Sequence, residues 1–203
     1  MIHRGGLAGT VALVLCAAGA AAGNDRPVLR PLHDVDVTYQ LDAGGGSLLH
    51  ERLRWDVASQ RLRVDPPTVG LYVIIDFVAR RMSTVRLTER TVIEMAAPDN
   101  ATGMPDGAAA AAVRQGADMV AGLACTEWDM TDAAGEASRL CLTDDGVLLR
   151  ARAGGRTLLS AETVRYGALD AELFQPPAGY AHQRLGPQPG SPRVVRAQPG
   201  RPE

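Results

Sequence analysis

The stretch LYVIIDFVARRMSTVRLTERTVIEM, residues 71–95, decides the fold class. Its apolar runs 71–77, 82–87 and 91–95 alternate between two faces, and only short polar segments separate them. A period of two places successive side chains on opposite faces of a strand. The stretch therefore predicts three antiparallel strands joined by tight hairpins.

The same period extends along the chain in both directions from this stretch, with turn residues at intervals of roughly 8–12 positions. Asp145-Gly146 is a strong hairpin signal, because both residues tolerate positive φ. The pattern predicts one mainly β domain over residues 33–180, a single antiparallel sheet with one or two short helices. Its further expected strands are 35–41, 49–56, 61–64, 113–122, 124–130, 138–143, 147–153 and 157–166, followed by an extended segment at 172–180.

The first residues have the layout of an export signal. A basic start precedes an apolar run and then small residues, so residues 1–22 are expected to form a signal peptide cleaved near Ala22. The alternative, an uncleaved anchor helix, is disfavoured because the run is short and diluted by Gly and Ala. Leu15 precedes Cys16 where a bacterial lipoprotein needs a small residue. We therefore expect a soluble protein, periplasmic or secreted.

Two segments break the strand pattern. Residues 96–112 carry a run of five alanines that can form one helical turn or a low-complexity loop, and both interpretations stay open. Residues 181–203 are rich in Pro, Gly and Arg and have no apolar period, so a disordered tail is expected there.

Composition argues against nucleic acid as a partner. The chain has 203 residues, a formal net charge of −2 and 4% aromatic residues, and all 21 of its basic residues are Arg. A nucleic-acid-binding domain needs a strongly basic face or aromatic stacking platforms. The near-neutral charge instead fits a globular domain, which we expect to be a monomer.

Cysteine spacing favours one disulfide in the exported protein. Cys16 leaves with the signal peptide, which leaves Cys125 and Cys141. Two thiols in an oxidising compartment predict a bond between them, although free thiols remain the alternative. No CxxC partner or clustered His supports a metal site.

No catalytic constellation is visible. The mature chain has His33, His50 and His182, none beside a nucleophile in a known motif, and no nucleotide or zinc motif occurs. Asp76 is the one acid inside a strongly apolar strand, and we expect it to face solvent or an Arg. The sequence predicts a protein that is not an enzyme and has no metal or cofactor.

The blocks LYVIIDFVARRM, TVIEM, VAGLACTEWDM, SRLCLTDDGVLLRARAGG and FQPPAGY resemble an uncharacterised family of exported bacterial proteins. That family is similar in turn to the lipoprotein-carrier superfamily (LolA and LolB-like). The resemblance spans residues 33–180 and implies a half-barrel with an apolar concave face under short helices. Only about ten residues separate the cleavage site from the first strand, so the long N-terminal helix of true carriers is absent, which leaves 97–112 as the candidate lid.

An apolar concave face predicts a binding function. A sheet with one apolar face must have that face covered, either by its own side chains or by a ligand. Two functions follow: an exported protein holding a lipid or other hydrophobic small molecule, or a structural, interaction or sensor protein of the envelope with a closed core and a protein partner. The candidate inward residues are Leu49, Leu53, Trp55, Val73, Ile75, Phe77, Trp128, Leu140 and Leu142.

Overall fold

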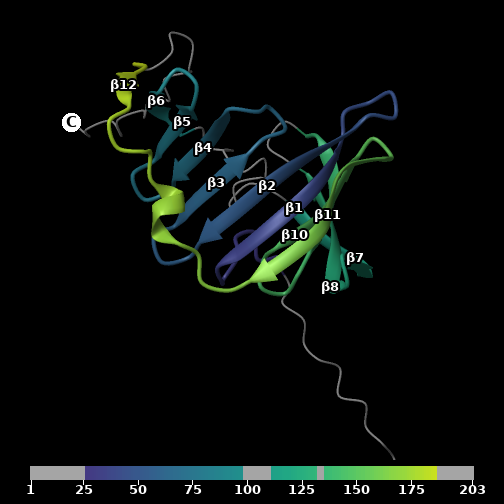
Figure 1. Cartoon of the computed structure of the whole chain (residues 1–203). Helices are drawn as coiled ribbons and strands as arrows, with labels where there is room; N and C mark the ends of the chain where they lie inside the picture. Colours follow the sequence, from purple (N-terminus) through teal and green to yellow (C-terminus); the bar gives the residue numbers. More distant parts are fainter. Residues whose placement is uncertain (1–25, 98–110, 132–134, 187–203) are drawn as a thin grey trace, which may run out of the picture.

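The structure is a computed structural model that describes residues 26–97, 111–131 and 135–186. Twelve strands form one sheet in the order β12-β6-β5-β4-β3-β2-β1-β11-β10-β9-β8-β7 (Figure 1). The strands are β1 Val35–Asp42, β2 Leu48–Asp56, β3 Arg61–Asp65, β4 Leu71–Asp76, β5 Arg81–Arg86, β6 Thr91–Ala96, β7 Ala111–Val120, β8 Leu123–Thr131, β9 Ala137–Leu142, β10 Leu148–Ala153, β11 Arg156–Tyr166 and β12 Ala181–Arg184. The predicted mainly β sheet is confirmed.

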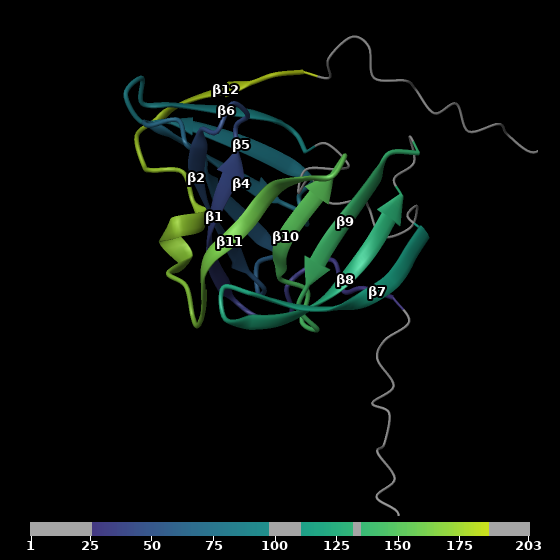
Figure 2. The ribbon, with the colours of Figure 1, turned by 90° about the vertical axis from the view of Figure 1, so that its right-hand side faces the viewer.

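Two runs of hairpins meet at the centre of the sheet. β1 pairs with β2 on one side and with β11 on the other, so β1–β6 and β7–β11 form two halves joined by the β1–β11 ladder. The sheet is strongly curved, and β8–β10 stand in front of β2–β5 in Figure 2. Its edge strands β12 and β7 are not neighbours, so the sheet stays open.

Local turn chemistry explains the hairpins. The turns after β2, β4 and β5 each end on a residue with positive φ, namely Gln60, Arg80 and Arg90. Gly146 has φ +91° in the turn between β9 and β10, where its N–H donates to the Thr143 carbonyl at 3.0 Å. The hairpin predicted at Asp145-Gly146 is present.

The described residues contain one helix, the four-residue 3₁₀ helix η1 (Ala171–Phe174). Asp170 caps it by accepting a hydrogen bond from the Glu172 N–H at 2.9 Å, and Phe174 is buried. Most of the predicted lid, 97–112, lies outside the described residues. The predicted tail also begins differently, because 181–184 form β12, a parallel edge strand on β6.

Candidate functional site

The register of the strands sorts the inward side chains into rows that cross the sheet. The first row runs Val35, Trp55, Leu62, Ile75 and Met82, each directly paired with the next across β1–β5. The second row runs Val37, Leu53, Val64, Val73, Thr84 and Ile93 across β1–β6. The third row pairs Tyr39 with Glu51, and the fourth pairs Leu41 with Leu49. We call the side that carries these rows the inner face.

The first row is closed. Val35, Trp55, Leu62 and Ile75 are buried members of the main core cluster. The Trp55 ring also packs against Phe77, with ring centroids 5.5 Å apart. Trp55 Nε1 is buried and has no hydrogen-bond partner within residues 26–97, 111–131 and 135–186. Burial of these large apolar side chains makes this end of the inner face the hydrophobic core of the β1–β5 half.

Residues 26–34, which we call the N-terminal strap, close the same end. The Arg30 guanidinium lies 4.5 Å from the centre of the Phe77 ring, and Leu29 packs on the cluster around Trp128. The Leu32 N–H donates to the Asp145 carbonyl at 2.9 Å. The strap therefore contacts both halves of the sheet.

A glycine makes the passage of the strap possible. A Cβ atom at Gly146 would lie 2.4 Å from the Arg30 carbonyl oxygen and 2.8 Å from Val28 Cγ1. Both distances are shorter than van der Waals contact, so no larger residue fits without moving the strap. The positive φ of the hairpin turn and the close approach of the strap require the same glycine.

Beyond their buried β1 members, Val37 and Tyr39, the second, third and fourth rows are only half-buried or exposed. Leu53, Val64 and Val73 of the second row are partly exposed and pack against the core cluster from one side. Leu159 of β11 is paired with Leu41 and is also half-buried. Leu49 ends the fourth row and is 42% exposed. The inner face thus changes from a closed core to an accessible apolar surface along the strands.

Glu51 introduces a carboxylate into this half-buried surface. It lies on β2 between Leu49 and Leu53 and is paired with Tyr39 on β1. Burial raises the pKa of Glu51, and in the described part of the chain its side chain makes no hydrogen bond or ion pair. Burial, and then the charge of Glu51, raise the pKa of Tyr39, whose hydroxyl donates to the Leu148 carbonyl at 2.6 Å.

The other half of the sheet contributes a second closed cluster. Trp128, Met130, Leu140, Leu142 and Ala151 are all buried, and Leu29 of the strap packs against them. The pairing of Trp128 with Leu140 and of Leu140 with Ala151 carries this cluster across β8, β9 and β10.

The structure divides the nine candidate inward residues by burial. Trp55, Ile75, Trp128, Leu140 and Leu142 lie in closed clusters; Leu53, Val73 and Phe77 are half-buried; Leu49 is exposed. Sequence reasoning missed Leu41, Glu51 and Leu159. Glu51 lies two residues from both Leu49 and Leu53 along the strand. Alternate residues of a strand share a face, so the sequence alone could have placed Glu51 on the apolar face.

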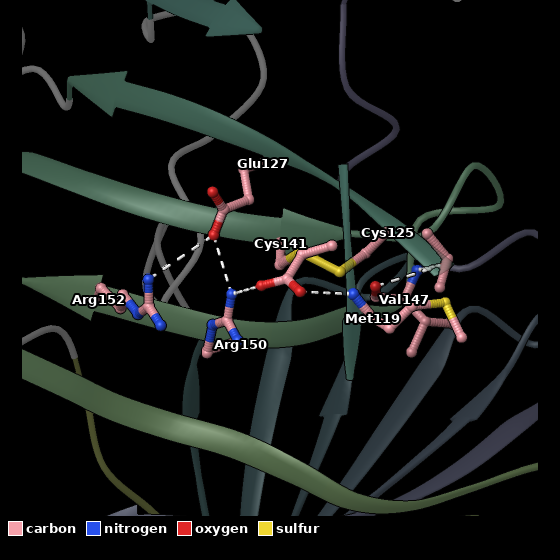
Figure 3. The surroundings of a disulfide bond; sticks show 9 residues. Met119, Cys125, Glu127, Cys141, Val147, Arg150 and Arg152 are labelled. Carbon is pink, nitrogen blue, oxygen red and sulfur yellow. Dashed lines mark hydrogen bonds and ion pairs between the residues drawn. A yellow bond between two sulfur atoms is a disulfide. The ribbon is translucent and has the colours of Figure 1, made fainter. Parts of the chain in front are cut away.

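The predicted disulfide is confirmed. Cys125 and Cys141 are bonded between β8 and β9, and both are buried (Figure 3). Arg150 lies beside them, where it forms ion pairs with Asp118 and, at 2.9 Å, with Glu127. The bond and the ion pairs tie β7, β8, β9 and β10 together, which indicates a structural role.

The outer face of β1–β4 carries an ion-pair ladder. Asp36 accepts hydrogen bonds from Arg52, and Arg54 donates to Asp65 at 2.6 Å. Burial alone would raise the pKa of Asp36, but the hydrogen bond and charge of Arg52 together lower it. Arg63 stacks 3.7 Å from the centre of the Tyr72 ring. These interactions satisfy the charged groups of the outer face, which next to them carries a buried apolar cluster of Tyr72, Ile74, Val85 and Val92 with Tyr180 packed against it.

The acid and histidines singled out by the sequence also have ordinary partners. Asp76 forms an ion pair with Arg61 at 3.0 Å, as expected of an acid facing an Arg. His50 contacts Glu162 at 3.2 Å, and His182 contacts Glu94 at 3.5 Å. Within the described ranges, no group of three or more His, Cys, Asp or Glu side chains is placed to hold a metal ion. No helix in those ranges is long and apolar enough to span a membrane.

No protein-family model and no curated protein matches this chain. Among solved structures, an uncharacterised conserved protein of Thermus thermophilus matches at 14% identity with a TM-score of 0.56, over 75% of this chain and 91% of that one. PNGF-II matches at 12% identity and a TM-score of 0.50, over 75% and 31% of the two chains. MucB matches at 16% identity and a TM-score of 0.50, over 73% and 59%.

These likenesses show the fold. This chain spans less than two thirds of the PNGF-II and MucB chains that it matches. These likenesses support the open, curved antiparallel sheet that the sequence predicts. Membership of one exported family stays a prediction.

Proposed function

We propose that this protein is an exported, non-enzymatic binding protein that holds a hydrophobic small molecule or lipid on the half-buried part of its inner face. One observation carries the proposal: across β2–β6, beyond the buried Val37 of β1, the second row of the inner face is mainly apolar but only half-buried. Leu53, Val64 and Val73 pack against the core cluster on one side and have no full cover on the other. Accessible apolar surface of this kind is typical of ligand sites.

The expected signal peptide over residues 1–22 and the disulfide support an oxidising compartment outside the cytoplasm. We place the protein in the periplasm or the medium on these grounds.

The structure supplies a matched pair of variants for the test. Leu49 lies on the inner face, whereas its neighbour Leu48 lies on the other face of the same strand and is similarly exposed, at 55% against 42%. Leu49→Gln should weaken binding of an uncharged fluorescent alkyl probe about fivefold, because a partly buried leucine contributes about 1 kcal/mol. Leu48→Gln should leave binding unchanged.

The protein for this test is purified from the periplasm of an export-competent host, and native mass spectrometry with lipid extraction identifies any bound molecule. A ligand-free monomer that also ignores the apolar probes would overturn the proposal.

A second candidate function is an interaction or sensor protein of the envelope. It is favoured by the five candidate residues that lie in closed clusters, and by the exposed side chains Leu32, Val57 and Tyr166. These three line an open cleft of about 780 Å³ beside the strap. A ligand-free protein that binds an envelope protein, with loss of binding in Val57→Asp, would establish this function instead.

A further inference from the structure

Glu51 is unlike the other carboxylates of the β1–β6 half. Asp36, Asp76 and Glu94 are buried or nearly so, and each has an arginine partner. Glu51 is half-buried among leucines and has no such partner in the described part of the chain. Removing a carboxylate from water without a partner opposes folding, and such costs are concentrated at functional sites.

A second group on the same strand face is also unsatisfied. Trp55 is 5% exposed, and its indole N–H has no acceptor among the residues that the structure describes. It follows Glu51 by four residues on β2, so both groups have their side chains on the inner face. Buried polar groups without partners are uncommon in native proteins and call for an explanation. Of the two groups, Trp55 lies in the covered first row, whereas Glu51 lies on the half-buried part of the face, where a ligand can reach it.

We infer that the inner face selects amphiphiles with a cationic head, with the ammonium group against Glu51 and the alkyl chain along the second row. The inference rests on the proposed function and names the chemical class of its ligand. Charge complementarity carries it: a carboxylate placed between Leu49 and Leu53 attracts a cation and repels an anionic head.

The second row is long enough for such a chain. From Leu53 on β2 to Ile93 on β6 it crosses four strand spacings, roughly 19 Å at the usual distance between strands. That length suits a dodecyl chain. The row is apolar at Leu53, Val64, Val73 and Ile93, and Thr84 adds a methyl group.

The test compares three probes that share one chain and differ in their head: dodecylamine, dodecanol and dodecanoic acid, titrated calorimetrically at neutral pH into the full chain. The amine is protonated under these conditions. We expect the amine to bind at least about tenfold more tightly than the alcohol, as for a hydrogen bond to a charged group, and the acid to bind most weakly.

Glu51→Gln should remove the preference for the amine and leave alcohol binding unchanged. Glu89→Gln is the matched control, because Glu89 is exposed in the turn between β5 and β6 and makes the same change in net charge. Glu51→Leu should tighten alcohol binding and weaken amine binding. Far-UV circular dichroism confirms that each variant is folded.

The outcomes separate this inference from the function on which it rests. If the three probes bind with equal affinity, or Glu51→Gln keeps the preference for the amine, the inference is wrong while the binding function stands. If none of the probes binds to the folded protein, the binding function itself fails.

Discussion

Replacing Gly146 by Ala tests whether the N-terminal strap holds the closed end of the sheet. The new methyl group would lie 2.4 Å from the Arg30 carbonyl oxygen, so the strap must move. The variant is therefore destabilised in two ways. It loses the contacts of the strap, and alanine is strained at a positive φ. Gly155→Ala is the matched control, because Gly155 has φ +76° in the next hairpin turn and no atom within 4 Å of the added methyl group.

The contacts of the strap set the expected magnitude. The hydrogen bond from the Leu32 N–H to the Asp145 carbonyl contributes about 1 kcal/mol. Half-burial of Leu29 contributes about 1 kcal/mol, and Arg30 over Phe77 contributes about 0.5–1 kcal/mol. The positive φ costs both variants about 1–2 kcal/mol. Gly146→Ala should therefore lower the free energy of unfolding by about 2–3 kcal/mol more than Gly155→Ala.

Urea unfolding followed by circular dichroism measures both variants, and hydrogen exchange at the Leu32 amide reports on the strap itself. A double-mutant cycle with Leu29→Ala adds a second check, because a strap already displaced by Gly146→Ala has no packing left to lose. Equal destabilisation by Gly146→Ala and Gly155→Ala, to within about 0.5 kcal/mol, would refute the role assigned to the strap.

Three further predictions concern the disulfide and two carboxylates. Replacing Cys125 and Cys141 by Ser should lower the free energy of unfolding by about 3 kcal/mol, as expected for a loop with a sequence separation of 16, and chemical denaturation measures this. The lowered pKa of Asp36 means that its stabilising effect is present above the unfolded-state pKa and is lost as the pH falls through the folded-state value. Asp36→Asn should therefore be less stable than the parent by about 2 kcal/mol at pH 7, and acid unfolding should show this difference shrink as the pH falls through the folded-state pKa of Asp36. The raised pKa of Glu51 gives the opposite pH dependence of stability. The stabilising contribution of Glu51 is present below the unfolded-state pKa and is lost as the pH rises through the folded-state pKa. Glu51→Gln should gain stability over the parent as the pH rises from 4 to 7, and thermal melting across that range would contradict the assignment if the two curves stayed parallel.

The strands could be predicted from the sequence because their signals are local. Residues 71–95 contain three apolar runs and polar turns, and the structure places β4, β5 and β6 within a residue or two of the expected bounds. β12 gave no such signal. All four of its side chains are exposed, and it is held by backbone pairing to β6 and by ion pairs to Glu94, which leave no apolar period.

The extent to which each inward side chain is buried could not be predicted in the same way. Strand parity places Leu53 and Trp55 on one face, and the structure confirms this placement. Yet Trp55 is buried and Leu53 is half-buried, because the strap and Phe77 close one end of that face. The strap has no periodic pattern, and its position depends on contacts with residues far away in the sequence, such as Gly146. The alternation of residues along a strand predicts which face a side chain lies on, whereas tertiary contacts determine how far that side chain is buried.

The two ends of the inner face therefore differ in whether other residues of the chain cover or pair their side chains. At the strap end, apolar side chains are covered by the protein's own residues. At the other end, a chain with 21 arginines leaves Glu51 without one in the part that the structure describes, although it supplies arginines to Asp36 and Asp76. A half-buried carboxylate that opposes folding is the kind of local conflict that native proteins tolerate at functional sites, and our proposal assigns Glu51 to such a site. It follows that Glu51→Gln should move two properties in opposite directions, with higher stability at neutral pH and lower selectivity for cationic amphiphiles. A purely structural carboxylate would not couple these two properties.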